Sequence, residues 1–261
     1  MKKILISLAC VASMASIANA DMARIEMGIG GWNATSSGGA SYTDTRTLSL
    51  VNGTYKSNEN DSNNMYAWML IKHPIPVLPN LRLEYANMED DGLVSGEFKD
   101  FASSAPVDTP ATLEMTQFDI IPYYNILDNT AWLTLDLGLD IKIQETKYSV
   151  STKSVHGVAY EGYNDNATLV LPMLYGRLRM EVPATGIALE TDVKYVTYDG
   201  STVYDARVKV DYTFDLGMFV DPALELGYRV QKFDIDYEDG SDHTTSDLKF
   251  AGIYAGLMLR F

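Results

Sequence analysis

The chain has a single cysteine, few positive charges and no long apolar run beyond its first residues. Cysteine occurs once in 261 residues, and Lys and Arg number 20 against 35 Asp and Glu, which gives a formal net charge of −15. Such acidity disfavours a nucleic-acid partner, because nucleic-acid binding needs a basic footprint. No stretch of about eighteen apolar residues follows the N-terminal segment, so no membrane-spanning helix is expected.

The N-terminus carries the pattern of an export signal. Lys2 and Lys3 precede an apolar stretch over residues 4–17, and Ala18-Asn19-Ala20 then supplies the small-x-small sequence that signal peptidase accepts. We therefore predict a cleaved signal peptide over residues 1–20 and a mature protein over residues 21–261. Removal of the two lysines changes the formal charge from −15 to −15 − 2 = −17, and removal of Cys10 leaves the mature chain without a thiol.

Long segments of the mature chain alternate apolar and polar residues with a period of two. In residues 131–144 every odd position holds Ala, Leu or Ile, whereas the even positions are mostly polar. The same alternation recurs in residues 187–196, 205–215, 224–231 and 248–261. This pattern predicts β-strands, and a strand of about nine to eleven residues can cross a bilayer at a tilt. A soluble β-sandwich also alternates in this way and is the alternative fold.

The last of these segments combines the alternation with a terminal aromatic residue. Apolar side chains occupy every second position at Ile253, Ala255, Leu257, Leu259 and Phe261. This ending resembles the carboxy-terminal signal that the barrel-assembly machinery reads in bacterial outer-membrane β-barrels. Together with the signal peptide and the long alternating strands, it favours a membrane barrel over a soluble sandwich.

Ten strands can be placed along the chain, and an even number is typical of a bacterial barrel. Their centres lie near Ile29, Met69, Leu83, Ile120, Leu137, Leu174, Val193, Val210, Tyr228 and Ala255. Short periplasmic turns are expected at residues 73–80, 125–130, 183–186 and 219–222, and outer loops at residues 34–64, 88–113, 145–166, 199–202 and 238–246. The sequence thus predicts an all-β fold, a transmembrane antiparallel up-and-down β-barrel of about ten strands with long extracellular loops and short periplasmic turns.

With these features, the chain resembles a family of small, functionally uncharacterised outer-membrane β-barrel proteins described from epsilonproteobacteria. The resemblance is carried by Gly28–Gly31, Tyr123–Asp128, Leu135–Leu139, Leu171–Tyr175, Tyr204–Val210, Asp247–Phe250 and Tyr254–Gly256. It implies a place in the outer membrane and a barrel fold. It implies no substrate and no catalytic residue.

Charged residues of both signs lie on the strand face opposite the apolar one. Ten strands leave at most a narrow lumen, so these side chains are expected to pair across it as a salt-bridged core. The alternative is a narrow, low-selectivity pore in which Arg177, Arg179, Arg207 and Arg229 form a basic belt that favours anions. The candidate lumen charges are Arg24, Glu26, Arg82, Glu84, Asp119, Asp136, Asp140, Lys142, Arg177, Arg179, Glu181, Glu190, Asp192, Lys194, Arg207, Lys209, Asp211, Glu225, Arg229 and Arg260.

Histidines near acidic residues raise the question of catalysis. Some ten-stranded barrels with long outer loops resemble omptin proteases, which use carboxylates and a histidine near the rim, and His243 with Asp239 and Asp242 could polarise a water molecule. His73 and His156 lie in other connections. No GxSxG or HExxH segment occurs, so no catalytic residue is assigned and no enzymatic activity is expected.

The acidic run over residues 234–242 is a second candidate site in the outer connections. Carboxylate oxygens suit a hard divalent cation, but Asp239 stands where an EF-hand loop requires glycine. The run could bridge to lipopolysaccharide phosphates through loosely held cations, or it could be a solvated acidic rim. No metal ligand and no cofactor are assigned.

The sequence therefore predicts an integral protein of the outer membrane, exported through a cleaved signal peptide, with both termini periplasmic. Its expected role is structural or surface-interaction. A narrow pore is the alternative, and an omptin-like protease is a remote one. The expected partners are outer-membrane lipid, lipopolysaccharide approached through divalent cations, and the barrel-assembly machinery, and the chain is expected to be a monomer that binds no nucleic acid.

Overall fold

The computed structural model describes residues 24–44, 51–75, 77–96, 105–130, 132–151, 153–155, 158–160, 163–217, 219–240 and 242–261. The predicted signal peptide lies outside these residues. Every regular element is a β-strand, and the strands are β1 (Arg24–Asp44), β2 (Val51–Ser57), β3 (Asp61–Lys72), β4 (Asn80–Gly96), β5 (Ala105–Thr130), β6 (Leu133–Val150), β7 (Lys153–Val155), β8 (Val158–Tyr160), β9 (Tyr163–Glu181), β10 (Ile187–Tyr198), β11 (Ser201–Thr213), β12 (Asp221–Asp239) and β13 (Asp242–Arg260). The described part of the chain contains no helix with the length and apolar character to span a membrane.

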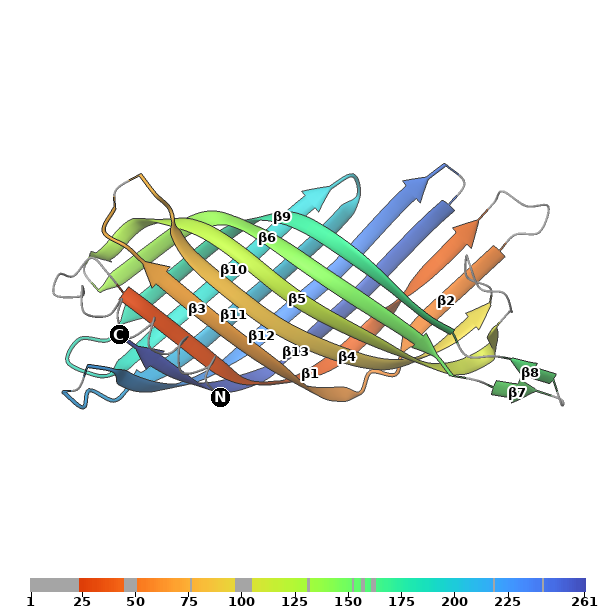
Figure 1. Cartoon of the computed structure of the whole chain (residues 1–261), viewed down its shortest axis with the longest axis horizontal. Helices are drawn as coiled ribbons and strands as arrows, with labels where there is room; N and C mark the ends of the chain where they lie inside the picture. Colours follow the sequence, from red (N-terminus) through yellow and green to blue (C-terminus); the bar gives the residue numbers. More distant parts are fainter. Residues whose placement is uncertain are drawn as a thin grey trace, which may run out of the picture.

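Eleven of the strands form one antiparallel sheet that closes on itself (Figure 1). The ring closes where β1 pairs with β13, from Glu26 opposite Arg260 to Asp44 opposite Asp242. Strands β2 and β3 both lie between β1 and β4, so the eleven strands occupy 11 − 1 = 10 positions around the ring. The predicted up-and-down barrel of about ten strands is confirmed, and β7 and β8 form a separate small hairpin.

The interruption between β2 and β3 has a local cause. Glu59 has a φ of 58°, which breaks the extended conformation at the centre of the Asn58-Glu59-Asn60 segment. The Asn58 amide donates to the carbonyl of Asp91 at 3.0 Å, and the Ser36 amide donates to the carbonyl of Asn60 at 3.4 Å. The irregular segment is therefore tied to both neighbouring strands, and the wall remains continuous there.

At the end of the barrel opposite the termini, the paired strands extend much farther than the sequence predicted, because long loops were expected there. Much of residues 34–64, 88–113, 145–166 and 238–246 belongs to paired strands that extend the barrel outward, while residues 45–50, 97–104 and 161–162 lie outside the described residues. The prediction of long loops there is wrong for the paired parts. Over these extensions the outward side chains become polar, while several inward ones such as Leu113 and Met115 are apolar. The outward apolar alternation used to place the strands is therefore lost there, although the backbone pairing continues.

Strands β10 and β11 are the short part of the wall. They turn at Asp199 and Gly200, which have φ values of 48° and 83°. Strand β9 begins at Tyr163, but its pairing with β10 begins at Leu174, opposite Tyr195. The outer part of β9 therefore extends past the β10–β11 hairpin along one edge.

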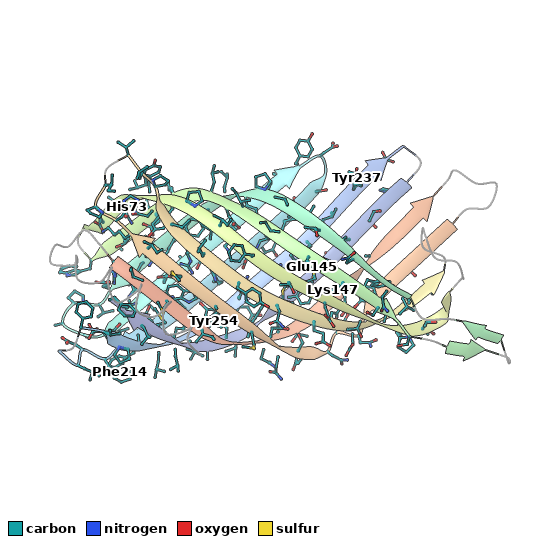
Figure 2. The ribbon with its side chains drawn as sticks, viewed as in Figure 1. His73, Glu145, Lys147, Phe214, Tyr237 and Tyr254 are labelled. Carbon is teal, nitrogen blue, oxygen red and sulfur yellow. The ribbon has the colours of Figure 1, made fainter. Side chains whose placement is uncertain are left out.

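Side chains project from the strands all around the barrel (Figure 2), and the two faces of the wall differ in chemistry. Large apolar side chains such as Leu139, Val193, Leu226 and Leu257 face outward and are about half exposed, at 55%, 46%, 53% and 62%. The alternate residues point inward and are buried. This inside-out distribution is typical of a barrel surrounded by lipid.

Candidate functional site

The charged side chains predicted for the lumen lie inside the barrel. Arg24 is at the end that holds the termini, with its side chain 40% exposed, and Glu181 and Arg260 are partly exposed at the same end. The other predicted lumen charges are all 8% exposed or less. Asp205, which is fully buried, was missed, although its position on the polar face of a strand was a usable signal. We call these buried ionic residues the charged layer.

Glu84 joins opposite sides of the barrel within this layer. Lys194 Nζ lies 2.5 Å from Glu84 Oε2, and Arg207 Nη2 lies 2.5 Å from Glu84 Oε1. Glu84 is on β4, whereas Lys194 and Arg207 are on β10 and β11, which are not its neighbours in the sheet. These ion pairs therefore cross the lumen and connect walls that the backbone hydrogen bonds do not connect.

Asp205 and Asp119 hold two further cations. Arg229 donates two hydrogen bonds to Asp205, from Nε at 2.9 Å and from Nη2 at 2.7 Å. Lys142 donates to both carboxylate oxygens of Asp119 at 2.9 Å, and Lys194 contacts Asp119 as well. Bidentate, charge-assisted hydrogen bonds of this kind are among the strongest in proteins.

Glu190 contacts three cationic side chains in the part of the charged layer nearer the termini. Arg177 Nη2, Arg179 Nη1 and Lys209 Nζ lie 2.8, 3.3 and 3.3 Å from its carboxylate oxygens. Arg179 also donates to both oxygens of Asp211, at 2.6 and 3.1 Å. Several cations share each carboxylate, so the layer is a network and not a set of separate pairs.

The four arginines proposed as a basic belt are all neutralised. Arg177, Asp192, Arg207 and Arg229 stand opposite one another on β9, β10, β11 and β12. Each of these arginines, and Arg179, has a carboxylate oxygen within 2.7 Å. The geometry is that of a salt-bridged core.

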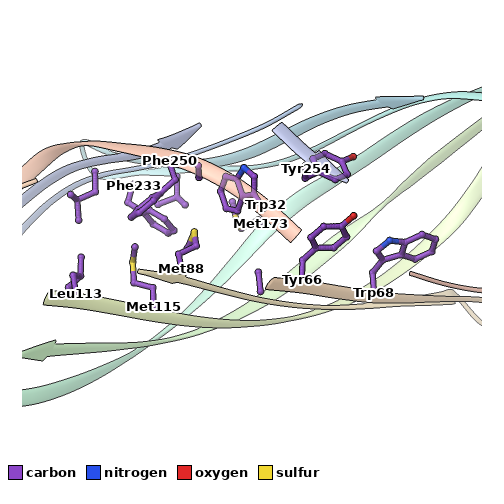
Figure 3. Close-up of a cluster of buried hydrophobic side chains, with 14 of the residues drawn as sticks. Trp32, Tyr66, Trp68, Met88, Leu113, Met115, Met173, Phe233, Phe250 and Tyr254 are labelled. Atoms are coloured by element: carbon purple, nitrogen blue, oxygen red, sulfur yellow. The ribbon is translucent and has the colours of Figure 1, made fainter. Parts of the chain in front are cut away.

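Aromatic side chains pack against the charges, and Figure 3 shows three of these rings, Trp32, Tyr66 and Trp68, without the charged residues. The guanidinium carbon of Arg229 lies 4.7 Å from the centroid of the Trp32 ring, a favourable cation–π geometry. The Tyr66 hydroxyl and the Trp68 indole donate to Glu225 Oε1 at 2.8 and 3.1 Å. The rings occupy space that water would otherwise fill.

Little space remains in the charged layer. Two cavities among its described residues have volumes of about 10 Å³ each, one bordered by Trp32 and the other by Asp119, and both touch Arg207. Each can hold roughly one water molecule. Neither of these two cavities is large enough to hold a continuous water column.

Asp140 is an exception within the layer. Its side chain is fully buried, and neither carboxylate oxygen has a hydrogen-bond partner among the described residues. Lys142, two positions along the same strand face, donates to Asp119 instead. A buried carboxylate without a partner is destabilising.

Beyond the charged layer the lumen widens into a cavity of about 680 Å³, which we call the cup. Its base and sides are mainly apolar, and Figure 3 shows Leu113, Met115 and Phe233 grouped apart from Tyr66 and Trp68. The cup is lined by Ala40, Ser41, Tyr55, Leu113, Met115, Gln144, Thr146, Tyr148, Asn166, Ala167, Thr168, Leu169, Ser201, Phe233, Ile235, Tyr237, Thr244, Ser246 and Leu248. The sequence did not reveal the cup, because its lining comes from eight different strands.

Three glutamines separate the cup from the charged layer. Gln117 Nε2 donates to Gln144 Oε1 at 3.0 Å, and Gln231 Nε2 donates to Gln117 Oε1 at 2.9 Å. Lys142 Nζ reaches Gln117 from the charged side at 3.5 Å. This amide cluster closes the base of the cup.

Asp90 is a buried carboxylate that the sequence did not indicate. It accepts hydrogen bonds from the hydroxyls of Ser36, Tyr55 and Ser57 at 2.5, 2.7 and 3.0 Å. These donors come from β1 and β2, while Asp90 is on β4. The cluster binds three strands together beside the irregular segment after β2.

The two described histidines lie at opposite ends of the barrel, and the side chains of Asp239 and Asp242, the predicted partners of His243, lie outside the described residues. His243 Nε2 lies 2.7 Å from Asp236 Oδ1, and both side chains are largely exposed. His73 is bonded to the carbonyl of Pro79 at 2.9 Å, and His156 lies outside the described residues. Among the described residues, no three His, Cys, Asp or Glu side chains are grouped so as to hold a metal ion.

Comparison with known proteins gives only distant structural matches. No family model and no curated protein matches the chain. The translocator domain of autotransporter NalP from Neisseria meningitidis is similar with a TM-score of 0.41 and 11% identity, covering 98% of each chain. The P. putida toluene transporter TodX has a TM-score of 0.27 and 10% identity, covering 94% of this chain and 91% of its own. A Pseudomonas aeruginosa FadL homologue has a TM-score of 0.30 and 9% identity, covering 95% and 92%.

Proposed function

We propose that this chain is an outer-membrane β-barrel protein with a lumen closed to ions and a structural or surface-interaction role. The charged layer is the observation that carries this proposal. Ion pairs such as Lys194–Glu84 and Arg207–Glu84 span the lumen, and the described cavities between them hold about 10 Å³ each. A passing ion would have to break several buried salt bridges at once.

The membrane position is supported by the outer surface of the barrel. Strands β10 and β11 have 12 and 13 residues, enough to cross a bilayer at a tilt, which takes about nine to eleven residues. Their outward residues run from Ile187 to Tyr195 and from Tyr204 to Tyr212, mostly apolar, with tyrosine at three of these four ends. A closed sheet leaves no unpaired edge within the hydrocarbon region.

The orientation follows from the chain ends. The N- and C-terminal strands β1 and β13 have their outer ends among the tall strands and their terminal ends together at the opposite end (Figure 1). Bacterial barrels have periplasmic termini, so the proposed orientation places the cup at the cell surface. An exported, monomeric protein assembled by the barrel-assembly machinery fits this arrangement.

The narrow-pore alternative is tested by single-channel recording. The refolded mature protein, shown to be folded by its heat-modifiable electrophoretic migration, should give no discrete conductance steps in planar bilayers. The lumen-facing variant Arg207→Ala should raise the conductance, whereas the outward-facing variant Val208→Ala should not. Regular steps from the unaltered protein, with an ion preference altered by Arg207→Ala, would establish the pore in place of the closed lumen.

Lipopolysaccharide is the proposed lipid partner at the rim. Asp234, Asp236 and Asp247 expose 50%, 57% and 70% of their side chains near the outer ends of β12 and β13. Carboxylates can approach lipid phosphates only through bridging divalent cations. Chelation of Mg²⁺ should lower the unfolding temperature in vesicles that contain lipopolysaccharide and leave it unchanged in phosphatidylcholine vesicles.

The omptin-like alternative makes a separate prediction. It requires peptide cleavage by the folded protein in the presence of lipopolysaccharide and loss of that cleavage in His243→Ala. We propose no catalytic role, so peptides of mixed sequence should remain intact under these conditions.

A further inference from the structure

The cup has a side opening above the short β10–β11 hairpin. Among the described residues, β9 pairs with β10 from Leu174 inward. Strand β10 ends three residues farther out, at Tyr198, whereas β9 continues outward to Tyr163, so the outer part of β9 extends past the hairpin without a strand paired on that edge. On the other side of the β10–β11 hairpin, the Ser201 hydroxyl at the hairpin tip donates a hydrogen bond to the Asp236 carbonyl of β12 at 3.0 Å. The edge of β9 and the hairpin tip therefore border an interruption in the wall.

The lining of the cup indicates that it reaches this interruption. Successive residues of a strand point to opposite faces, so a cavity behind a continuous wall touches alternate residues. Strands β5, β6, β12 and β13 contribute such alternate residues to the lining. Strand β9 instead contributes the four consecutive residues Asn166–Leu169, as expected where a cavity extends around the edge of a strand.

The opening lies at the outer limit of the lipid-facing surface. Outward side chains are apolar up to Val170 on β9 and Ile143 on β6, and these residues stand opposite each other. The next outward pair is Thr168 opposite Glu145. The opening therefore adjoins the apolar outer surface, and Leu169 of the cup lining is next to the outward-facing Val170.

The polarity of the cup changes along its depth. Phe233, Leu248 and Met115 are 2%, 6% and 2% exposed and lie deepest, next to the amide cluster. Asn166, Thr168 and Ser201, at the opening, carry amide and hydroxyl groups. This gradient suits a molecule with an apolar tail and a polar head that stays at the rim.

We propose that the cup binds the hydrocarbon chain of an outer-leaflet lipid, which enters sideways between the β9 edge and the β10–β11 hairpin. The cavity volume of about 680 Å³ falls within the range of about 300–1,000 Å³ usual for small-molecule sites. The polar head of the lipid remains at the opening, and the tail lies against the apolar side chains of the base. This binding is independent of whether the charged layer conducts ions.

The test uses quenching of tryptophan fluorescence by brominated lipid chains. Trp132 is 55% exposed in the turn between β5 and β6, so the mature protein is prepared with Trp132→Phe, which leaves the lumen residues Trp32 and Trp68. A reporter in the cup is added by Phe233→Trp, with Leu248→Trp as a second, independent reporter. Each protein is refolded into dioleoylphosphatidylcholine vesicles and into vesicles of phosphatidylcholine with dibrominated chains, and folding is checked by heat-modifiable migration.

We expect the cup reporters to lose more fluorescence in brominated vesicles than Trp32 and Trp68, which measure quenching through the wall. Ala167→Phe, which narrows the opening from the inner face of β9, should remove this excess, with Ala167→Leu as a milder variant. Ser149→Phe, on the outward face of adjacent β6, should leave it unchanged. Reporters quenched no more than Trp32 and Trp68, or an excess that persists in both Ala167 variants, would overturn the proposal.

Discussion

Asp205 offers a direct test of the charged layer, because one substitution leaves a defined cation without its partner. Asp205 is fully buried and accepts two hydrogen bonds from Arg229. The ammonium groups of Lys194 and Lys142 lie 3.7 and 3.9 Å from it. Asp205→Asn keeps the shape of the side chain and removes its charge, while Arg229 remains in place over the Trp32 ring.

The expected magnitude follows from the burial of both partners. Arg229 is 3% exposed, so it cannot turn to water when Asp205 is neutralised. Removal of one partner of a buried ion pair costs about 3–5 kcal/mol of unfolding free energy, which corresponds to roughly a hundred- to several-thousand-fold change in the folding equilibrium. Lys147→Gln is the matched surface control, because Lys147 and Glu145 expose 54% and 43% of their side chains, and such pairs contribute about 0–1 kcal/mol.

The assay is urea unfolding of the refolded protein in phosphatidylcholine vesicles, followed by heat-modifiable electrophoresis. The double variant Asp205→Leu with Arg229→Met should recover most of the loss, because apolar residues can replace a buried ion pair at little cost. An Asp205→Asn effect no larger than that of Lys147→Gln would refute the argument. A double variant as unstable as the single one would also refute it.

Three other substitutions test further features by the same unfolding assay or by assembly in cells. Asp140→Asn should raise the unfolding free energy, because a neutral amide costs less to bury than a carboxylate without a hydrogen-bond partner. Asp136→Asn should lower it, because Asp136 accepts a hydrogen bond from an arginine at 2.6 Å, and two effects of the same sign would contradict this. Gly252→Ala should weaken the pairing of β1 with β13, because the added Cβ would lie 1.8 Å from a backbone oxygen. The control Gly31→Ala adds a Cβ that meets nothing closer than 3.8 Å. Equal stability of the two variants would show that the β1–β13 pairing adjusts. Deletion of Phe261 should reduce the amount of assembled barrel in cells but leave refolding in vitro largely intact, and an unchanged cellular amount would exclude the proposed assembly signal.

The sequence alone was sufficient for the part of the barrel in which the strands carry outward apolar side chains. Each of the ten predicted strand centres lies within a strand of the barrel, because lipid on one side and a polar lumen on the other impose a strict alternation. The same alternation placed Lys194, Glu190 and Arg179 inside the barrel. The alternation did not predict the outer strand extensions. There neither face contacts lipid, and the polar residues of β2 and of the outer part of β9 resemble a loop.

The pairing of the charges and the shape of the cup were decided only by the tertiary structure. Lys194 and Glu84 are 110 residues apart, and nothing local to either residue identifies the other. Strand tilt and register in the closed ring determine which side chains face each other across the lumen, and these depend on the pairing of all the strands together. The cup likewise depends on how far each strand extends past its neighbour. The early turn of β10–β11 at Asp199 and Gly200 leaves an opening in the wall only because β9 and β12 continue beyond it.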